Sequence, residues 1–149
     1  MSHLLPVYAR SDFTFVKGEN IYLYDEKGNK YLDFAAGIGV NSMGHCHPKL
    51  VEALEKQNKQ LWHVSNMYHI NHAEDLATKI ANASKFAHYV FFCNSGAEAV
   101  ECGIKMIRKY HDSNGNPDKY RIITFEGGFH GRTMATISAA KKDKLTEGY

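Results

Sequence analysis

Two strand-like runs, 89–93 and 121–125, dominate the hydrophobic pattern in the second half of the chain. The first is apolar at every position, which is typical of a strand covered on both faces of a parallel sheet. Between the runs, apolar residues recur at helical spacing from Gly96 to His111, and an Asn-Gly-Asn-Pro breaker follows. The pattern predicts a strand–helix–strand unit with a right-handed crossover between parallel strands.

The first half of the chain predicts a β-hairpin over residues 21–34. β-prone residues at 21–24 and 30–34 flank a turn-rich Asp-Glu-Lys-Gly-Asn loop. Pro48 then suits the first turn of a helix, where its missing N–H would be unpaired in any case. The apolar face expected for that helix comprises Leu50, Val51, Leu54 and Leu61.

A further helix is predicted to open at Asn71, with Glu74 as the partner of a capping box. The fold class is therefore α/β. Two parallel strands do not make a stable sheet with both faces covered, so the pattern predicts more strands than the chain supplies. Ligands of such sheets bind beyond the carboxyl ends of the strands. This directs attention to the turns that follow the two apolar runs.

The turn after the first run, Ser95-Gly96-Ala97, can hold a phosphate. It opens a helix, whose first N–H groups lack partners and whose dipole is positive at this end. Gly96 and Ala97 are small enough for close approach, and Ser95 adds a hydroxyl. An ordinary capped helix, with Asn94 or Ser95 as the cap, explains the same residues, so both interpretations stay open here.

The turn after the second run, Gly-Gly-Phe-His-Gly-Arg-Thr, carries different chemistry. Phe129 can stack on a heteroaromatic ring, and the planar guanidinium of Arg132 suits a carboxylate. The alternative is that Phe129 is a core residue and Arg132 a solvated residue at a helix start. The glycines around Phe129 and His130 favour a backbone bent for close approach. For His130 we favour a packing or supporting role.

Composition bounds the function further. With 44% hydrophobic and 23% charged residues and a net charge of +2, the chain is typical of a soluble globular protein, without a basic run for nucleic acid. We expect a cytoplasmic protein with reduced thiols, because the three cysteines follow no secretory signal and no apolar stretch could span a membrane.

Other ligand motifs are excluded or weak. Gly39 to Gly44 has the glycine spacing of a P-loop, but His45 and Cys46 stand where Lys and Ser or Thr are required. No Gly-x-Gly-x-x-Gly follows a strand, so a dinucleotide fold lacks support. The His45-Cys46-His47 cluster has no second ligand group at zinc-site spacing, and we expect no metal.

Linked motifs point to a family. Asn-Ser-Gly-Ala-Glu-Ala at 94–99 and Phe-His-Gly-Arg-Thr at 129–133 are preceded by the segments YLDFAAGIGVNSMGHCHP and LWHVSN. Together they closely resemble the class III aminotransferases that use pyridoxal phosphate (PLP), and within that class the acetylornithine aminotransferases. The resemblance runs from about Leu5 to the last residue.

The resemblance implies a PLP-dependent transferase type I (aspartate aminotransferase-like) fold, present only in its N-terminal portion. Residues 1–44 would be the N-terminal segment of the small domain, with its hairpin, and residues 45–149 the incomplete first part of the large domain. Ser95, Gly96 and Ala97 would hold the cofactor phosphate, Phe129 would stack on its ring, and Arg132 would bind the substrate carboxylate. Ile38 fits the acetylornithine type, because ornithine δ-aminotransferases tend to have tyrosine there.

The implied reaction moves the δ-amino group of N-acetyl-L-ornithine to 2-oxoglutarate, giving glutamate in arginine biosynthesis, in an enzyme that is a homodimer. The family's Schiff-base lysine would lie beyond residue 149. Lys105 and Lys109 fall in the body and last turn of a helix, and Lys141, Lys142 and Lys144 in a polar tail. We therefore expect an inactive N-terminal portion. A related ω-aminotransferase acting on ornithine, 4-aminobutyrate or succinylornithine, and a non-catalytic fragment, are the alternatives.

Overall fold

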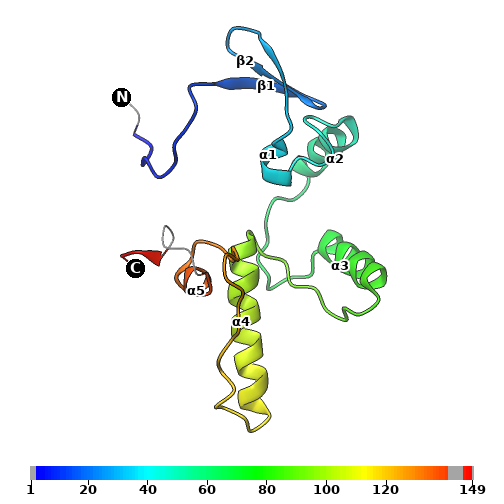
Figure 1. Cartoon of the computed structure of the whole chain (residues 1–149). Helices are drawn as coiled ribbons and strands as arrows, with labels where there is room; N and C mark the ends of the chain where they lie inside the picture. The colour runs from blue at the N-terminus through cyan, green and yellow to red at the C-terminus, as the bar shows by residue number, and fades with distance from the viewer. Residues whose placement is uncertain (1–2, 141–145, 149) are drawn as a thin grey trace. The chain divides into compact units, whose positions relative to one another are not determined.

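The chain forms two compact units in a computed structural model, which describes residues 3–140 and 146–148. One unit spans Met1–Tyr68 and the other His69–Tyr149 (Figure 1). Each unit is described by itself below. The division into residues 1–44 and 45–149 follows the family's domains rather than compactness, and it stays a prediction.

A three-stranded antiparallel sheet organises the first unit. Its strands are β1 (Phe15–Glu19), β2 (Tyr22–Asp25) and β3 (Lys30–Leu32), in the order β1-β2-β3. The predicted hairpin is confirmed as β2 and β3, while β1 was not anticipated. The β1 pattern FVKGE ends in a glycine and a charged residue, so it offers a weak strand signal.

The side chain of Asp25 fixes the hairpin turn. Its carboxylate accepts hydrogen bonds from the backbone N–H groups of Lys27 and Asn29, at 2.9 and 2.8 Å, and from the Asn29 side chain and the Tyr31 hydroxyl. These bonds to the charged form, led by that from the Asn29 side chain, lower the pKa of Asp25. The turn is thus specified by one carboxylate within seven residues of sequence.

A second carboxylate closes the sheet onto the glycine-rich segment that follows. Asp33 Oδ2 lies 2.7 Å from His45 Nε2, and the backbone of His45 pairs with that of Asn20. Gly18 is required beneath the imidazole, because a Cβ there would lie 2.6 Å from the His45 ring. His45, a residue of the cluster considered for metal, is therefore occupied by a carboxylate and a packing contact.

Two helical segments complete the first unit. α1 (Ala36–Gly39) is a short irregular turn, because Gly37 and Ile38 have left-handed backbone angles. α2 (Pro48–Asn58) begins at Pro48 as predicted, and it ends before Leu61, which therefore does not belong to its apolar face. His47 precedes it as the N-cap residue.

The second unit contains α3 (Asn71–Ser84), α4 (Gly96–Ser113) and α5 (Met134–Ser138). α3 starts at the predicted residue, but the capping box is wrong. The N-cap position is Ile70, which makes no side-chain cap, and the Glu74 carboxylate lies 3.5 Å from His69 Nδ1 instead.

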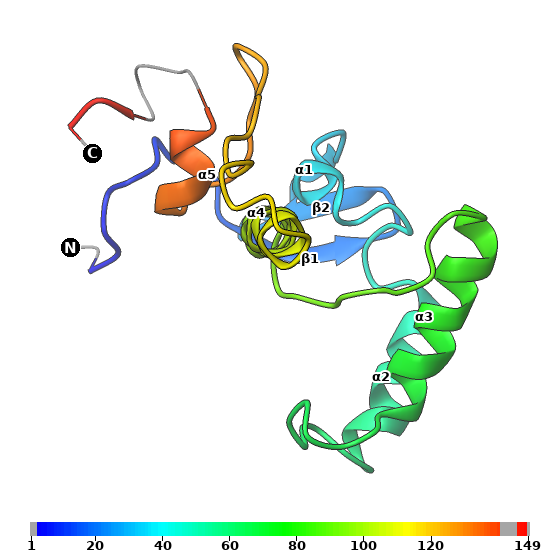
Figure 2. The ribbon, with the colours of Figure 1, turned by 90° about the horizontal axis from the view of Figure 1, so that it is seen from below.

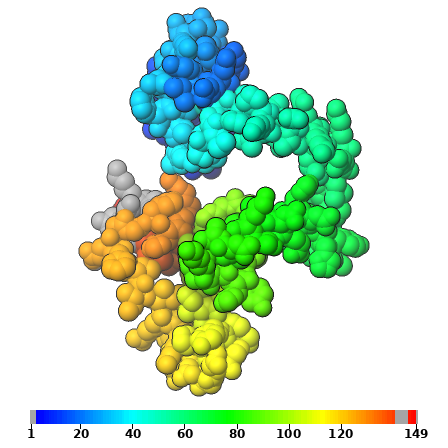
Figure 3. Space-filling view, turned by 90° about the vertical axis from the view of Figure 1, so that its right-hand side faces the viewer, coloured from blue at the N-terminus to red at the C-terminus, as the bar shows by residue number. Residues whose placement is uncertain are grey.

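α5 lies beside α4 in two views (Figures 1 and 2). The last turns of α4 and the loop after it, in yellow, project beyond the rest of the unit (Figure 3).

The strands predicted at 89–93 and 121–125 are wrong for the residues described. Both segments are irregular, and their side chains are largely exposed, with Tyr89 and Ile123 each 95% exposed. A strand needs hydrogen-bonded neighbours, and the sheet found in 3–140 and 146–148 uses β1, β2 and β3 alone. The intervening helix forms without them because its hydrogen bonds are internal.

Little apolar surface is buried in this structure. Ile137 and Ala140 are the buried hydrophobic residues among those described, and both lie in or next to α5. The small packed region of the second unit is therefore centred where α5 meets α4. In the described part of the chain, no helix combines the length and the apolar character needed to cross a membrane.

The Asp33–His45 contact predicts a pH response. The hydrogen bond from His45, with those from the Ala36 and Ala35 backbone, lowers the pKa of Asp33 from its ordinary 3.8. The stability contributed by this contact is therefore complete above that ordinary value and is lost as the pH falls through the lowered one. A carboxyl-carbon NMR titration should give Asp33 a midpoint below 3.8.

His45→Ala should raise that midpoint, because the strongest hydrogen bond to the carboxylate is gone. His72→Ala, an exposed histidine of α3 in the other unit, is the control and should leave it unchanged. An Asp33 midpoint that does not respond to His45→Ala would contradict the contact.

Candidate functional site

The first turn of α4 exposes backbone donors. Ser95 is the N-cap: its Oγ accepts a hydrogen bond from the Glu98 N–H at 3.2 Å. The Glu98 carboxylate turns back and accepts from the backbone N–H of Asn94 at 2.6 Å. Among the described residues, no acceptor takes the N–H groups of Gly96 and Ala97. The ordinary capped helix is thus real, and it leaves two donors for an anion.

Gly131 brings the second predicted turn against this helix start. A Cβ built on Gly131 would lie 2.7 Å from Ala97 Cβ and 2.8 Å from Thr136 Oγ1. Its φ of +132° is also one that side-chain-bearing residues rarely adopt. The glycine therefore permits two segments, far apart in sequence, to touch at the residue that follows Gly96. The close approach that the glycines predicted is therefore made to α4 of the same chain.

A hydrogen bond reinforces the contact one helical turn further along α4. The Thr133 hydroxyl donates to Glu101 Oε1 at 2.5 Å. Thr133 is also the N-cap of α5, where its N–H donates to Thr136 Oγ1 and its own Oγ1 faces that atom at 3.0 Å. Thr136 is completely buried. The start of α5 is therefore tied to α4 through Thr133, and Thr133 is in turn held by Thr136.

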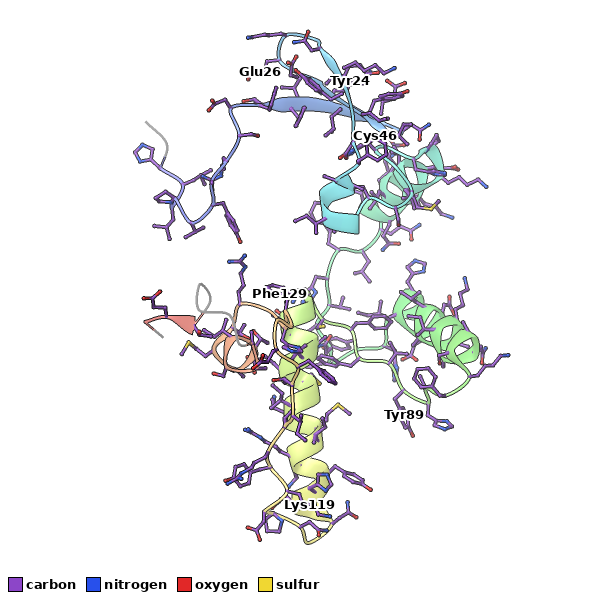
Figure 4. The ribbon with its side chains drawn as sticks, viewed as in Figure 1. Tyr24, Glu26, Cys46, Tyr89, Lys119 and Phe129 are labelled. Carbon is purple, nitrogen blue, oxygen red and sulfur yellow. The ribbon has the colours of Figure 1, made fainter. Side chains whose placement is uncertain are left out.

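The residues predicted to read a cofactor ring and a carboxylate lie on this same segment. Phe129 is 59% exposed, so it is accessible to a ligand and is not a core residue. Figure 4 places it at the N-terminal end of α4, opposite the end where Lys119 lies. Arg132 is exposed and immediately precedes Thr133. The structure thus brings all five candidates to one end of one helix.

His130 has a packing position, which agrees with the supporting role favoured for it. Its Nε2 is buried and has no hydrogen-bond partner among the described residues. The same atom lies 2.9 Å from where a Gly128 Cβ would be. Gly128 therefore makes room for the imidazole beneath the turn that carries Phe129.

The arrangement can bind a ligand that has an anionic group, an aromatic ring and a second, carboxylate anion. The donors of Gly96 and Ala97 suit a phosphate, Phe129 suits a flat ring, and the guanidinium of Arg132 suits a carboxylate. The residues present therefore fit PLP with an amino-acid substrate. The geometry adds to the sequence motifs that the two turns bearing these residues meet at the start of α4.

Comparison with known proteins identifies the family. Residues 7–149 match the family described as Aminotransferase class-III. The chain belongs to the class III aminotransferases. Pyridoxal phosphate is the cofactor that this family and its solved structures imply.

Curated relatives have one recurring name. The chain is 54% identical over 147 residues to acetylornithine aminotransferase 1 of Bradyrhizobium diazoefficiens. The matched region covers 99% of this chain and 36% of that protein. It is also 54% identical over 146 residues to acetylornithine aminotransferase of Agrobacterium fabrum, covering 98% of this chain and 36% of that protein. The chain thus spans about a third of the length of these relatives.

Solved class III structures share the fold. An ornithine aminotransferase of Toxoplasma gondii matches with a TM-score of 0.89 at 26% identity, over 98% of this chain and 35% of its own. An N-acetylornithine aminotransferase of Stenotrophomonas maltophilia matches with a TM-score of 0.76 at 39% identity, over 89% of this chain and 35% of its own. The α/β class and the type I transferase fold are therefore confirmed.

Sequence reasoning missed two residues of the site, Glu101 and Thr133. The signal for Thr133 was present, because a threonine directly before a helical pattern is an N-cap signature. The signal for Glu101 was not, because its partner lies 32 residues away. Of the lysines weighed as covalent partners of the cofactor, Lys105 and Lys109 are exposed on the body of α4, and the group at 141–144 lies outside the described residues.

The Gly131 contact gives a test of the site's geometry. Gly131→Ala should push the segment away from α4, because its Cβ would overlap Ala97 and Thr136 Oγ1. Overpacking of this kind costs about 1–3 kcal/mol, so amide hydrogens of α5 should exchange about tenfold faster or more, as measured by mass spectrometry.

Gly96→Ala is the matched control, because a Cβ at Gly96 would meet nothing within 4 Å. It should leave exchange in α5 unchanged. Equal exchange in the Gly131→Ala variant and the unmodified chain would show that the two turns are not in contact.

Proposed function

We propose that these 149 residues are the N-terminal part of an acetylornithine-type aminotransferase. The complete enzyme would transfer the δ-amino group of N-acetyl-L-ornithine to 2-oxoglutarate, forming glutamate, as a step of arginine biosynthesis. The observation that carries the proposal is the contact of Gly131 with Ala97, which joins the phosphate turn to the turn bearing Phe129 and Arg132. The recurring name of the curated relatives supports the choice of substrate.

Each site residue has a role in this proposal. Ser95, Gly96 and Ala97 bind the cofactor phosphate through a hydroxyl and two N–H groups, aided by the positive end of the α4 dipole. Phe129 covers one face of the pyridine ring and excludes water from it. When bound, PLP supplies a ring that accepts electrons from the amino-bearing carbon of the substrate.

Arg132 orients the amino donor in this scheme. Its guanidinium forms two parallel hydrogen bonds with the α-carboxylate, so the distal amino group of the substrate is directed toward the cofactor. The geometry thereby selects amino acids whose reacting amine lies at the far end of the molecule. No lysine among the described residues is proposed as the covalent partner of PLP, and the 149 residues are proposed to be inactive alone.

The setting proposed for the complete enzyme is a cytoplasmic homodimer that binds neither nucleic acid nor membrane. A second candidate is a related ω-aminotransferase, because the Toxoplasma gondii match is an ornithine aminotransferase. Ile38 favours the acetylornithine type over ornithine, since the latter class tends to have tyrosine there. Donors such as 4-aminobutyrate and succinylornithine belong to the same alternative. A non-catalytic fragment is the remaining one.

The phosphate role predicts a selective loss of affinity. Fluorescence titration of the chain should show tighter binding of pyridoxamine phosphate than of pyridoxamine, because only the former has the anion. Ser95→Ala should lower the affinity for pyridoxamine phosphate about fivefold to tenfold. This is the effect of losing one hydrogen bond of about 1 kcal/mol.

Ser113→Ala, at the opposite end of the same helix, is the control and should bind both compounds as the unmodified chain does. Equal affinity of the unmodified chain for the two compounds would refute the phosphate site.

The substrate role predicts donor preference. Residues 1–149 joined to the remaining part of the Bradyrhizobium diazoefficiens enzyme should prefer N-acetylornithine over ornithine, 4-aminobutyrate and succinylornithine in kcat/KM. Arg132→Lys should lower kcat/KM for N-acetylornithine about tenfold or more, because lysine keeps the charge but loses the bidentate fork.

The unaltered Bradyrhizobium diazoefficiens enzyme is the reference in this assay. Preference of the chimera for any of the other three donors would contradict the acetylornithine assignment.

A further inference from the structure

Two contacts join α4 to the segment that carries Arg132, and they lie on one face of the helix. Gly131 meets Ala97, and Thr133 donates a hydrogen bond to Glu101. Ala97 and Glu101 are four residues apart, so they share a face of α4. Arg132 lies between the two contacting residues of its own segment. Its backbone is therefore held at both neighbours.

Of the two contacts, the one with Glu101 restricts the position of the segment more strongly. Gly131 can rest on Ala97 over a range of orientations, because that contact is only steric. A hydrogen bond to a carboxylate fixes both distance and direction, and it is stronger than one between neutral groups. The second bond of Thr133, from its N–H to Thr136 Oγ1 at 2.9 Å, prevents its backbone from turning.

We propose that Glu101 is a positioning residue: through Thr133 it sets the separation between the phosphate-binding turn of α4 and the guanidinium of Arg132. The proposal rests on the proposed function, since it assumes that these two places bind the two anionic groups of one cofactor–substrate pair. Glu101 itself touches neither group. It fixes the spacing that a ligand with both groups must match.

The physical reason is the gain from binding two linked groups at once. When a ligand carries both anions, the second contact forms without a second loss of translational freedom, provided that the spacing is correct. A displacement of about 1 Å removes much of this gain while each anion still binds singly. The positioning role of Glu101 is therefore measured by a ratio: the affinity for a ligand with both anions divided by the affinity for a ligand with the phosphate alone. A general loss of stability would lower both affinities and leave this ratio unchanged.

The experiment compares two probes on the chain of 149 residues. Pyridoxamine phosphate carries the phosphate but no carboxylate. The reduced conjugate of PLP with N-acetylornithine, a stable secondary amine, carries the phosphate and the carboxylate in one molecule. Glu101→Ala and Thr133→Val should lower the affinity advantage of the conjugate about tenfold, the equivalent of one charge-assisted hydrogen bond, and change pyridoxamine phosphate binding less than about twofold.

Two variants serve as controls. Thr133→Ser keeps the hydroxyl and should retain the advantage of the conjugate. Lys105→Ala, also on α4 and exposed, should retain it as well. Hydrogen exchange of residues 131–137 without ligand should rise in Glu101→Ala and Thr133→Val and remain unchanged in the two controls, because only the first pair lose the bond to α4.

The outcomes separate this inference from the proposed function. Equal weakening of both probes by Glu101→Ala would make Glu101 merely structural, and unchanged affinity for both probes would make it irrelevant to the site. Either result overturns the inference while leaving the function standing. If the unmodified chain binds neither probe, the proposed function fails, and the positioning role falls with it. In that case the exchange data alone would still report whether Glu101 holds the segment.

Discussion

The close approach of Gly131 to Ala97 is the constraint on which the site depends. Both positions must be small, because any larger residue would separate the segment carrying Phe129 and Arg132 from the helix that carries the anion donors. Thr136 lies beside this contact, and both Thr136 and the next residue, Ile137, are buried. The proposed site for a phosphate and a carboxylate therefore depends on two of the smallest residues in the chain.

The elements that the sequence predicted correctly are those held by short-range contacts. The hairpin is specified by Asp25 and its turn, and α4 by Ser95 and the helical spacing of its apolar residues. The strands predicted at 89–93 and 121–125 are wrong because a strand depends on long-range contacts. A parallel strand is defined by neighbours distant in sequence, and the described residues supply none to these segments.

The same distinction applies to the site. The residue types at 95–97, 129 and 132 predict the ligand chemistry of the site from the sequence alone. Their mutual placement could not be read from the sequence, because the bond from Thr133 to Glu101 links positions 32 residues apart. Helical spacing gives the face on which Glu101 lies, but only the structure shows what meets that face.

The cap at the start of α4 has a further consequence for the order in which structure appears. Every bond that shapes this turn joins residues no more than four positions apart: Ser95 with Glu98, and Glu98 with Asn94. Contacts of such low sequence separation carry little loop-closure entropy and form early and fast. The turn proposed to bind the phosphate can therefore be complete before α5 has packed against α4. A phosphate that arrives during folding would find its donors already aligned.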